Sequence, residues 1–195
     1  RFGQQAVAAY GVATRIEQIA LLPTIGLNMA TLTLVAQASG AGLFDRVRSI
    51  VRTALAYGGV VMVFGAALIF FGARPLMGLF TDDPEVVAIG APYLRIAAFI
   101  EYAYVLLFVN TSALQGLKKP SFALWIGLYR QILAPVGAFW LLTRVWDNGL
   151  FGIWWGIFGI TWTAAIVAVW WAQRQVVRMA ATTPRPTAGP DPQVG

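Results

Sequence analysis

Five long apolar runs, separated by short polar or basic stretches, dominate the hydrophobic pattern of this chain. We predict that each run forms a helix, with bounds of about 5–38, 48–72, 84–115, 121–143 and 151–175. A helix needs about 20 predominantly apolar residues to cross the hydrocarbon core of a bilayer, and each run provides that length. A water-soluble protein has no place to bury five such helices. The pattern therefore predicts an all-α integral membrane protein, a polytopic helical bundle with five transmembrane helices.

The composition agrees with a chain whose main solvent is lipid. Hydrophobic residues make up 58% of the 195 residues and charged residues only 11%, whereas an ordinary globular domain carries about 25% charged residues. The net charge of +6 could indicate nucleic-acid binding, but the basic residues lie mostly between the spans and form no patch with interleaved aromatic residues. We therefore expect membrane lipid, and no nucleic acid, as a partner.

The sequence shows no pattern that is typical of an enzyme active site. It contains neither cysteine nor histidine, which excludes disulfides, thiol catalysis and histidine-based metal sites. It shows no nucleophile–base pair, no carboxylate dyad and no phosphate-binding GxxxxGK[ST] loop. We expect no catalytic residue, no metal and no cofactor.

The two ends of the chain differ in character. Residues 1–5 have the composition of a loop that runs straight into a helix, without the pattern of a signal peptide. An odd number of spans after such an abrupt start predicts a fragment of a larger membrane protein. Segment 180–195 is rich in proline and poor in apolar residues, so we expect a disordered tail after a membrane bundle that covers 1–179.

Basic residues are concentrated in alternate connections. Loops 39–49 and 115–121 and the C-terminal segment, with Arg52 just inside the second span, carry eight Lys or Arg residues. The opposite side carries only Arg1, Arg74 and Arg144, together with four acidic residues. The positive-inside rule then predicts a multi-pass protein of the cell (inner) membrane with a cytoplasmic C-terminus.

Local signals predict the starts of two helices. Asp83 should cap the third helix, with Pro84 in the first position, where a missing amide donor costs nothing. Glu85 adds a favourable charge at the positive end of the helix dipole. In the basic loop before the fourth helix, Pro120 should mark the helix start.

The first span departs from a plain lipid-facing helix. Pro23 lies in its middle and Gly26 follows three residues later, so the helix should bend there. The polar residues that flank this bend are Arg15, Glu17, Gln18, Thr24, Asn28, Thr31, Thr33 and Gln37. One face of this helix must therefore contact protein or a water-filled cavity.

Charged residues inside the spans are the sharpest functional signal, because each costs at least about 2.5–3.5 kcal/mol at the bilayer centre. Glu101 is the deepest of them, near the middle of the third span, with Tyr104 and Asn110 in its polar surroundings. Burial favours the neutral form of a carboxylate, so Glu101 could exchange a proton or bind a cation. It could equally be a structural residue that pairs with Arg130 or with another buried donor.

The other intramembrane charges leave alternatives open. Arg15 and Glu17 are two residues apart and point about 200° from each other, so they cannot form a tight pair. Glu17 either faces a cavity or has a structural role at the outer rim. Arg15 and Arg95 can extend to the membrane interface. Arg130, deep in the fourth span, could neutralise Glu101 or line a path for anions.

Several short stretches together form a recognisable set. The first part of the chain contains AYGVATRIE at 9–17, LP at 22–23 and LVAQASGAG at 34–42, and LFTDDPEV at 79–86, YLRI at 93–96 and ALQG at 113–116 follow. The set resembles the multidrug and toxic compound extrusion (MATE) transporters, in which the first three stretches would be the seventh loop and the eighth helix. The match runs from about residue 3 to residue 175 in the order and spacing of the family.

The resemblance implies a twelve-helix transporter of two six-helix lobes, of which this chain would supply helices 8–12. The missing N-terminal lobe would then be a partner of this chain. Family members export organic, often cationic or amphipathic drug-like compounds in exchange for H⁺ or Na⁺. In the sodium-coupled branch an aspartate on the tenth helix binds the cation, and its position here falls on Tyr104. This departure favours H⁺ as the coupling ion, with Glu101 supplying a carboxylate one turn earlier.

From the residues and the resemblance together we hypothesise one site for the coupling ion and the substrate. Its candidate residues are Glu101, Glu17, Tyr104, Asn28, Asn110 and Arg130, with Pro23 and Gly26 as a hinge for alternating access. Two rival functions stay open at this point. One is a flippase for lipid-linked saccharides from the same superfamily, whose cavity would hold several basic residues. The other is a membrane remnant or scaffold that transports nothing.

Overall fold

The computed structural model describes residues 3–137 and 149–182, and within these ranges all regular structure is helical. The elements are α1 (Gln4–Gly40), α2 (Phe44–Gly78), α3 (Pro84–Gly116), α4 (Ser121–Leu128), a π-helix (Tyr129–Leu133) and α6 (Gly149–Thr182). Four helices, α1, α2, α3 and the Trp154–Met179 part of α6, are long and apolar enough to cross a membrane. The prediction of an all-α polytopic membrane bundle is thereby confirmed.

The fourth predicted run is described only in part. α4 and the π-helix are followed by α-helical backbone up to residue 137. Segment 138–143, at the end of this predicted span, and 183–195, most of the predicted disordered tail, lie outside the described residues. Both expectations stay predictions.

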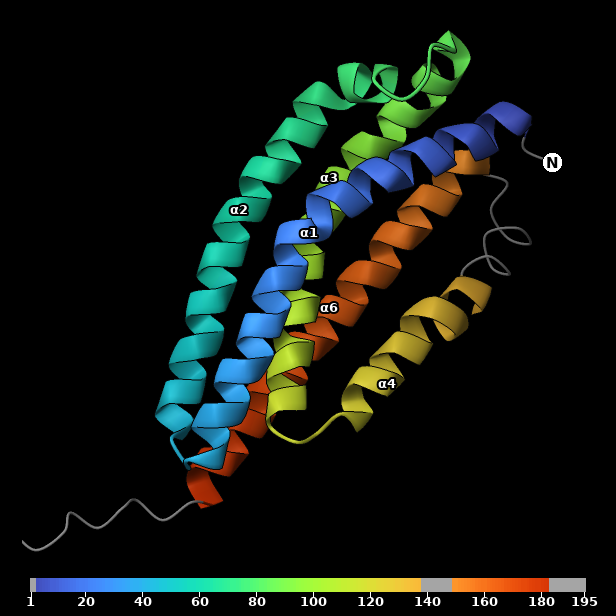
Figure 1. Ribbon diagram of the computed structural model, residues 1–195. Helices are drawn as coiled ribbons and strands as arrows, with labels where there is room; N and C mark the ends of the chain where they lie inside the picture. Colours follow the sequence, from blue (N-terminus) through green and yellow to red (C-terminus); the bar gives the residue numbers. More distant parts are fainter. Residues whose placement is uncertain (1–2, 138–148, 183–195) are drawn as a thin grey trace, which may run out of the picture.

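Helix α3 occupies the centre of the bundle, with α1, α2 and α6 packed around it and α4 to one side (Figure 1). Small residues form much of the contact between α1 and α3, where Ala9 and Ala13 pack in one cluster with Ala97 and Ala98. Small side chains allow helix backbones to approach closely, which is how membrane helices gain packing energy without a hydrophobic driving force.

α1 and α3 approach each other closely at the end of α3. A Cβ atom on Gly116 would be 2.9 Å from Val35 Cγ1 and 3.0 Å from both Leu32 O and Ala36 N. Two of these three atoms belong to the backbone of α1, so a side chain at Gly116 could not be accommodated by a rotamer change alone. Glycine at this position therefore sets how tightly the two helices cross.

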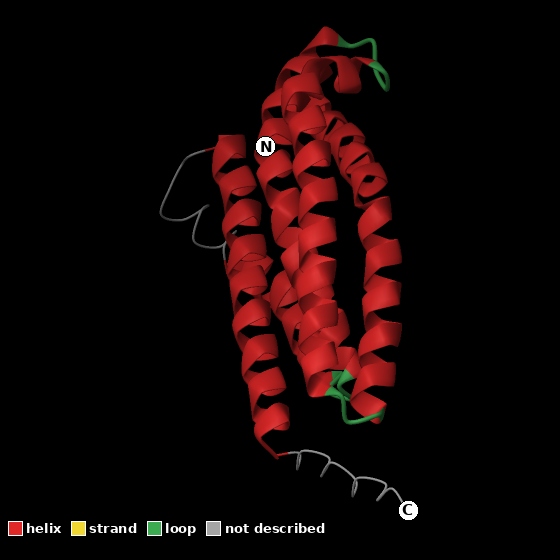
Figure 2. Cartoon of the chain, turned by 90° about the vertical axis from the view of Figure 1, so that its left-hand side faces the viewer, coloured by secondary structure: helices red, strands yellow, loops and turns green. Residues whose placement is uncertain are grey.

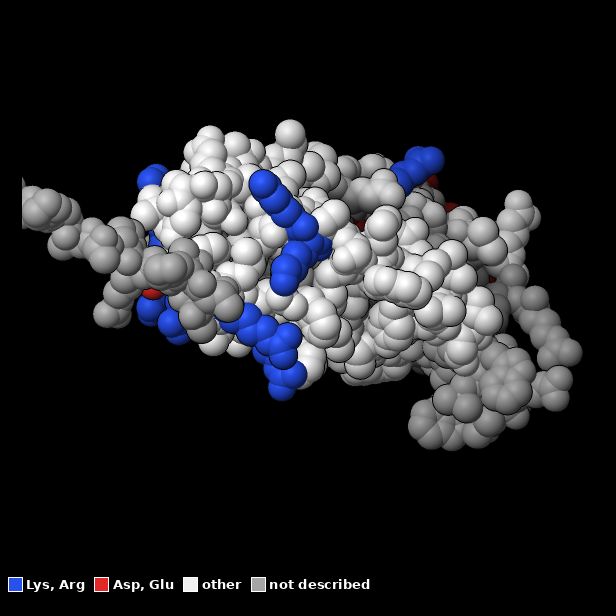
Figure 3. Space-filling view, turned by 90° about the horizontal axis from the view of Figure 1, so that it is seen from below, with Lys and Arg blue, Asp and Glu red and all other residues white. Residues whose placement is uncertain are grey.

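The three basic segments of the chain meet at one end of the bundle. The α1–α2 turn, the α3–α4 turn and the C-terminal end of α6 lie together there, while the acidic α2–α3 loop lies at the opposite end (Figures 1 and 2). A view onto the basic end shows Lys and Arg side chains distributed over it (Figure 3). Lys119 Nζ donates a hydrogen bond to Gln175 Oε1, which joins the α3–α4 turn to α6.

The helix ends follow the predicted local chemistry, with one small difference. Asp83 caps α3, because its Oδ1 accepts hydrogen bonds from Glu85 N at 2.9 Å and Val86 N at 3.5 Å, and Pro84 is the first helical residue. α4 begins at Ser121 and not at Pro120, since Pro120 is the residue that precedes the first helical turn.

Helix α1 continues through Pro23 without a break from Gln4 to Gly40. Figure 1 shows that this helix changes direction along its length. Proline removes one backbone hydrogen bond and crowds the preceding turn, so a bend without a break is the expected response. The structure thus contains a curved helix, and the use of Pro23 and Gly26 as a moving hinge stays a prediction.

Candidate functional site

Glu101 lies near the middle of α3 and is 1% exposed. Its Oε2 atom is buried and has no hydrogen-bond partner. A buried carboxylate without a partner is costly, and native structures seldom retain such a group without a functional reason. Glu101 is therefore the strongest single candidate for chemistry in the described chain.

Glu17 on α1 is the acid that lies within electrostatic range of Glu101. It is also close to the hydroxyl groups of Tyr93 and Tyr10 at the α1–α3 contact. Tyr93 is 2% exposed, and its ring centroid lies 5.4 Å from that of Tyr10 and 5.5 Å from that of Trp154. Tyr93 thus joins α1, α3 and α6 beside the acid. Sequence reasoning did not select Tyr93 as a site residue, because its role depends on the crossing of three helices.

Several polar residues of α1 lie along one face of the helix. Glu17, Thr24, Asn28 and Thr31 follow one another at steps of seven, four and three residues, which places them along one face. Thr24 and Thr31 are buried, and Asn28 has a buried Oδ1 atom without a hydrogen-bond partner. The burial of these residues agrees with the prediction that one face of this helix contacts protein. Asn28 lies about 16 Å along the axis from Glu17, so it lines the same face at a different depth.

Arg130 does not form the ion pair with Glu101 that was one sequence-based alternative, since no such bridge occurs among the described residues. Its guanidinium carbon lies 5.0 Å from the ring centroid of Tyr104, on α3. Tyr104 in turn interacts electrostatically with Glu17 and Glu101. The structure thus places Arg130 against Tyr104, and Tyr104 within electrostatic range of both acids.

Arg130 belongs to a π-helix that the sequence analysis missed. Here Ala134 N donates to Tyr129 O, five residues earlier, in place of the usual four. Pro135 follows at once, and its ring would crowd the carbonyl of Gln131 in a regular α-helix. The wider turn relieves that conflict, so Pro135 is the signal that could have predicted it. Such bulges are frequent at functional sites because they reorient side chains.

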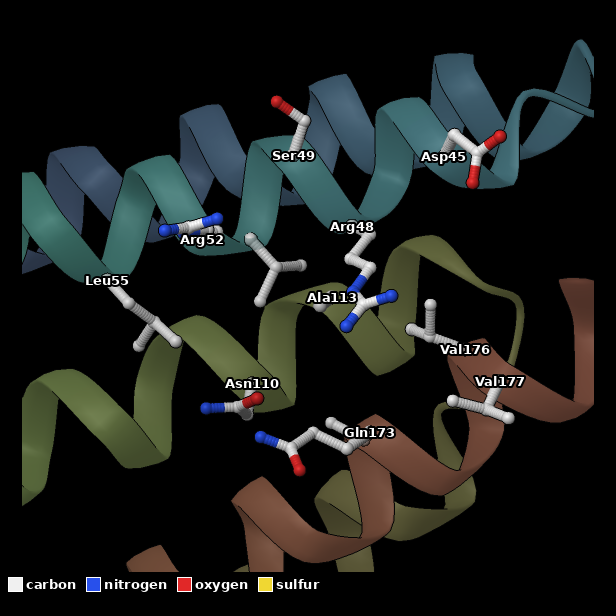
Figure 4. Close-up of a pocket in the computed structure, with 12 residues that line it drawn as sticks. Asp45, Arg48, Ser49, Arg52, Leu55, Asn110, Ala113, Gln173, Val176 and Val177 are labelled. Atoms are coloured by element: carbon white, nitrogen blue, oxygen red, sulfur yellow. The ribbon is translucent and has the colours of Figure 1, made fainter.

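Asn110 is separated from the other candidates. It lies nine residues after Glu101, about 13 Å along α3 and on its opposite face. Its Nδ2 atom donates a 2.7 Å hydrogen bond to Leu106 O. Asn110 lines a cavity of about 660 Å³ near the basic end of the bundle (Figure 4). The structure does not place it beside Glu101, which lines neither of the two described cavities.

The remaining sequence candidates lie at the margin of this neighbourhood. Arg15 and Arg95 are exposed side chains. Pro23 and Gly26 line a second cavity of about 390 Å³ together with Tyr57 and Gly58 of α2. Among the described residues no group of three or more Asp, Glu, His or Cys could hold a metal ion.

The arrangement has a simple chemical consequence. Two acids on neighbouring helices lie within electrostatic range of each other, and neither forms a salt bridge in the described chain. A proton or a bound cation would relieve their repulsion, and removal of that cation would restore it. The aromatic rings of Tyr10 and Tyr104, which are not fully buried, add surfaces to which an organic cation can bind.

A polytopic helical bundle with ionisable residues at bilayer depth is typical of membrane transport proteins. Within that class, the family model MatE matches residues 1–140, and the chain belongs to this family. It is 34% identical over 165 residues to "Probable multidrug resistance protein NorM" of Pseudomonas syringae, a match that covers 80% of this chain and 35% of that protein. It is 31% identical over 131 residues to the "FAD transporter" of Shewanella oneidensis, covering 66% of this chain and 28% of that protein.

The fold agrees with this assignment. The crystal structure described as MATE in the bent conformation superimposes with a TM-score of 0.86 at 22% identity, over 92% of this chain and 40% of that protein. The chain therefore spans well under half the length of these relatives, and it is a multi-pass membrane protein of the MATE transporter family.

Proposed function

We propose that this chain is the C-terminal part of a secondary active exporter of organic compounds, which exchanges its substrate for H⁺ or Na⁺. The observation that carries this proposal is the buried carboxyl group of Glu101, which has an unpartnered oxygen and interacts with Glu17. Membership of the MATE family and the likeness to proteins named for multidrug resistance support it.

In this proposal the coupling ion and the substrate compete for the same pair of acids. Binding of the ion to Glu101 or Glu17 neutralises the site and releases a cationic substrate. Loss of the ion on the other side of the membrane restores the negative charge and the affinity for the next substrate molecule. The bend at Pro23 and Gly26 in α1 would allow the site to open alternately to the two sides.

We infer that H⁺ is the coupling ion in preference to Na⁺. Sodium is a hard cation and needs several oxygen ligands around it. Glu101 is packed within an apolar helix, and the position that carries an aspartate in the sodium-coupled branch is Tyr104. A proton needs only one carboxylate oxygen, which Glu101 offers.

We further propose that the substrate is a small organic cation or an amphipathic drug, since the acids and aromatic rings at the site complement such a molecule. The membrane in question would be the cell (inner) membrane. The basic end of the bundle, and with it the C-terminus, would lie in the cytoplasm by the positive-inside rule.

The second candidate function is a flippase for lipid-linked saccharides. Arg130 favours it, because a guanidinium at bilayer depth without an acidic partner can bind an anionic pyrophosphate. The name of the FAD-transporting relative also concerns an anionic compound. Against this candidate, basic residues deep in the spans are few, with Arg130 foremost, whereas a pyrophosphate-binding cavity would hold several.

The test is gradient-driven efflux of a cationic dye from cells that express the full-length gene with Glu101→Gln. Glutamine keeps the size of the side chain and removes its charge and its proton exchange. We expect export to fall at least about tenfold, while the protein remains in the membrane at normal abundance. Glu85→Gln is the matched control, because Glu85 is an exposed acid at the end of the same helix.

Normal dye export by the Glu101→Gln variant would overturn the assignment of the coupling site to this residue. Absence of export by the wild-type protein, combined with binding of a pyrophosphate lipid that Arg130→Gln abolishes, would favour the flippase. A wild-type protein that neither exports dye nor binds such a lipid would support the remnant or scaffold.

A further inference from the structure

The largest cavity described above lies apart from the acidic site, between α2, α3 and α6 near the basic end of the bundle. It measures about 660 Å³ and is lined by residues of all three helices. Arg48, Arg52 and Leu55 come from α2, Asn110 from α3, and Gln173 and Val176 from α6 (Figure 4). The proposed transport function makes no use of this cavity.

Two arginines give the cavity its charge. Arg48 and Arg52 are four residues apart and therefore lie on one face of α2. Neither makes a hydrogen bond or a salt bridge to another residue in the described part of the chain. Asp45 also contributes to the lining, at the end of the cavity nearest the α1–α2 turn, which leaves a net charge of +1 for the lining.

The polar groups converge on the interior of the cavity. Figure 4 shows the guanidinium group of Arg48 directed from α2 into the space toward α3 and α6. The side-chain amides of Asn110 and Gln173 lie next to each other on the opposite wall. Asn110 is 1% exposed and one N–H of its amide donates to Leu106 O, so a buried amide with one remaining N–H lies across the cavity from Arg48.

Apolar residues complete the lining of the cavity. α2 runs from the basic end toward the middle, so Leu55 lies about 10 Å deeper than Arg48. Val176 of α6 packs against the cluster that contains Val47 of α2, close to the basic end, and Ala172 lies about one turn deeper on the same helix. The cavity thus combines two arginines near the end of the bundle with an apolar wall that continues past them to Leu55, and a phospholipid offers a matching phosphate and acyl chain.

We propose that this cavity binds the phosphate headgroup of an anionic membrane phospholipid, with its acyl chain along Leu55 and Val176. Guanidinium groups bind phosphate through paired, charge-assisted hydrogen bonds, and the two amides can donate to the remaining oxygens. Basic pockets between membrane helices are suited to lipid headgroups when they lie at the surface of the membrane. A water-soluble phosphate would gain nothing from the apolar wall, and the lipid therefore fits better. The inference is independent of the exported substrate and of the coupling ion.

The experiment measures thermal stability of the purified full-length protein in detergent after addition of phosphatidylglycerol, phosphatidylcholine or inorganic phosphate. We expect phosphatidylglycerol to raise the Tm by several degrees, and the other two additions to raise it far less. The double variant Arg48→Gln/Arg52→Gln should lose most of that increase. Arg46→Gln is the matched control, since it removes a neighbouring charge of the same helix that does not line the cavity.

A second variant keeps the test decisive if the double variant fails to fold. Gln173 is exposed, so Gln173→Glu should fold while placing a negative charge beside the proposed phosphate position, and it should also weaken the phosphatidylglycerol effect. An equal increase in the variants and the wild type, or an equal loss in Arg46→Gln, would overturn the proposal in favour of unspecific attraction to the basic end. An increase produced fully by inorganic phosphate would replace the lipid with a soluble anion and equally overturn it.

Discussion

Helices α2 and α3 are of similar length and both cross the bundle, yet they differ in how deeply they are buried and in where they carry charged residues. In the most apolar window of α3, 61% of the residues are buried, against 28% in α2. α3 carries Glu101 near its middle, whereas α2 has no charged residue between Arg52 and Arg74. Its exposed surface consists of large apolar side chains such as Phe64 and Phe71.

The difference shows what decides where this protein can keep a charge. A helix surrounded by protein can hold an acid at mid-depth, because neighbouring helices shield it from lipid. A peripheral helix keeps its charges at its ends, where Arg48 and Arg52 reach the headgroups and Arg74 reaches the opposite surface. The position of Glu101 in the central helix and the positions of Arg48 and Arg52 near the end of the peripheral helix both follow from this difference in surroundings.

The largest expected effect comes from placing an acid on the peripheral helix. Phe64 is 74% exposed near the middle of α2, and Phe64→Asp should cost about 2.5–3.5 kcal/mol of insertion energy. We expect a strong loss of membrane-inserted protein, measured as abundance in the membrane fraction of cells expressing the full-length gene. Phe64→Leu, which keeps the position apolar, should insert normally. Normal abundance of the aspartate variant would show that this face of α2 is not lipid-facing.

An intermediate effect is expected at the contact between α1 and the central helix. Gly116→Ala would place a Cβ 3.0 Å from backbone atoms of α1, so we expect a loss of about 1–3 kcal/mol of stability through overpacking. A lower Tm of the purified protein is the measurement. Gly127→Ala is the control, because nothing lies within 4 Å of its Cβ position. Equal Tm values for both variants would mean that α1 and α3 do not cross as closely as described.

The smallest effect concerns the start of α3. Asp83→Ala removes the acceptor for the amides of Glu85 and Val86 and should lower the stability by about 1 kcal/mol. Asp82→Ala, a neighbouring acid that does not cap the helix, should have almost no effect on the Tm. A similar decrease in both variants would point to loss of loop charge as the cause, in contradiction to the capping role.

Much of this architecture could be predicted because membrane helices depend on local sequence. Length and hydropathy identified the helices, Asp83 and Pro84 identified a helix start, and Glu101 was recognisable as a charge at bilayer depth. The relations between helices could not be predicted in this way. The interaction of Tyr93 with Glu17, and the position of Arg130 over the ring of Tyr104, depend on how separate helices cross.

Two features of the site were within reach of the sequence and were still missed. Asn110 is nine residues from Glu101, a spacing that places the two on opposite faces of α3, and only Asn110 lines the cavity near the basic end. Pro135 forces a wider turn in the helix before it, which gives rise to the π-helix that holds Arg130. Both follow from helix geometry applied residue by residue.

The account depends most directly on Glu101 as the group that exchanges the coupling ion. The decisive measurement is the internal pH of sealed proteoliposomes that contain the purified full-length protein, recorded after a cationic substrate is added outside. We predict a substrate-dependent proton flux in the wild type that is absent from the Glu101→Gln variant and retained in Glu85→Gln. An undiminished proton flux in Glu101→Gln would contradict the account.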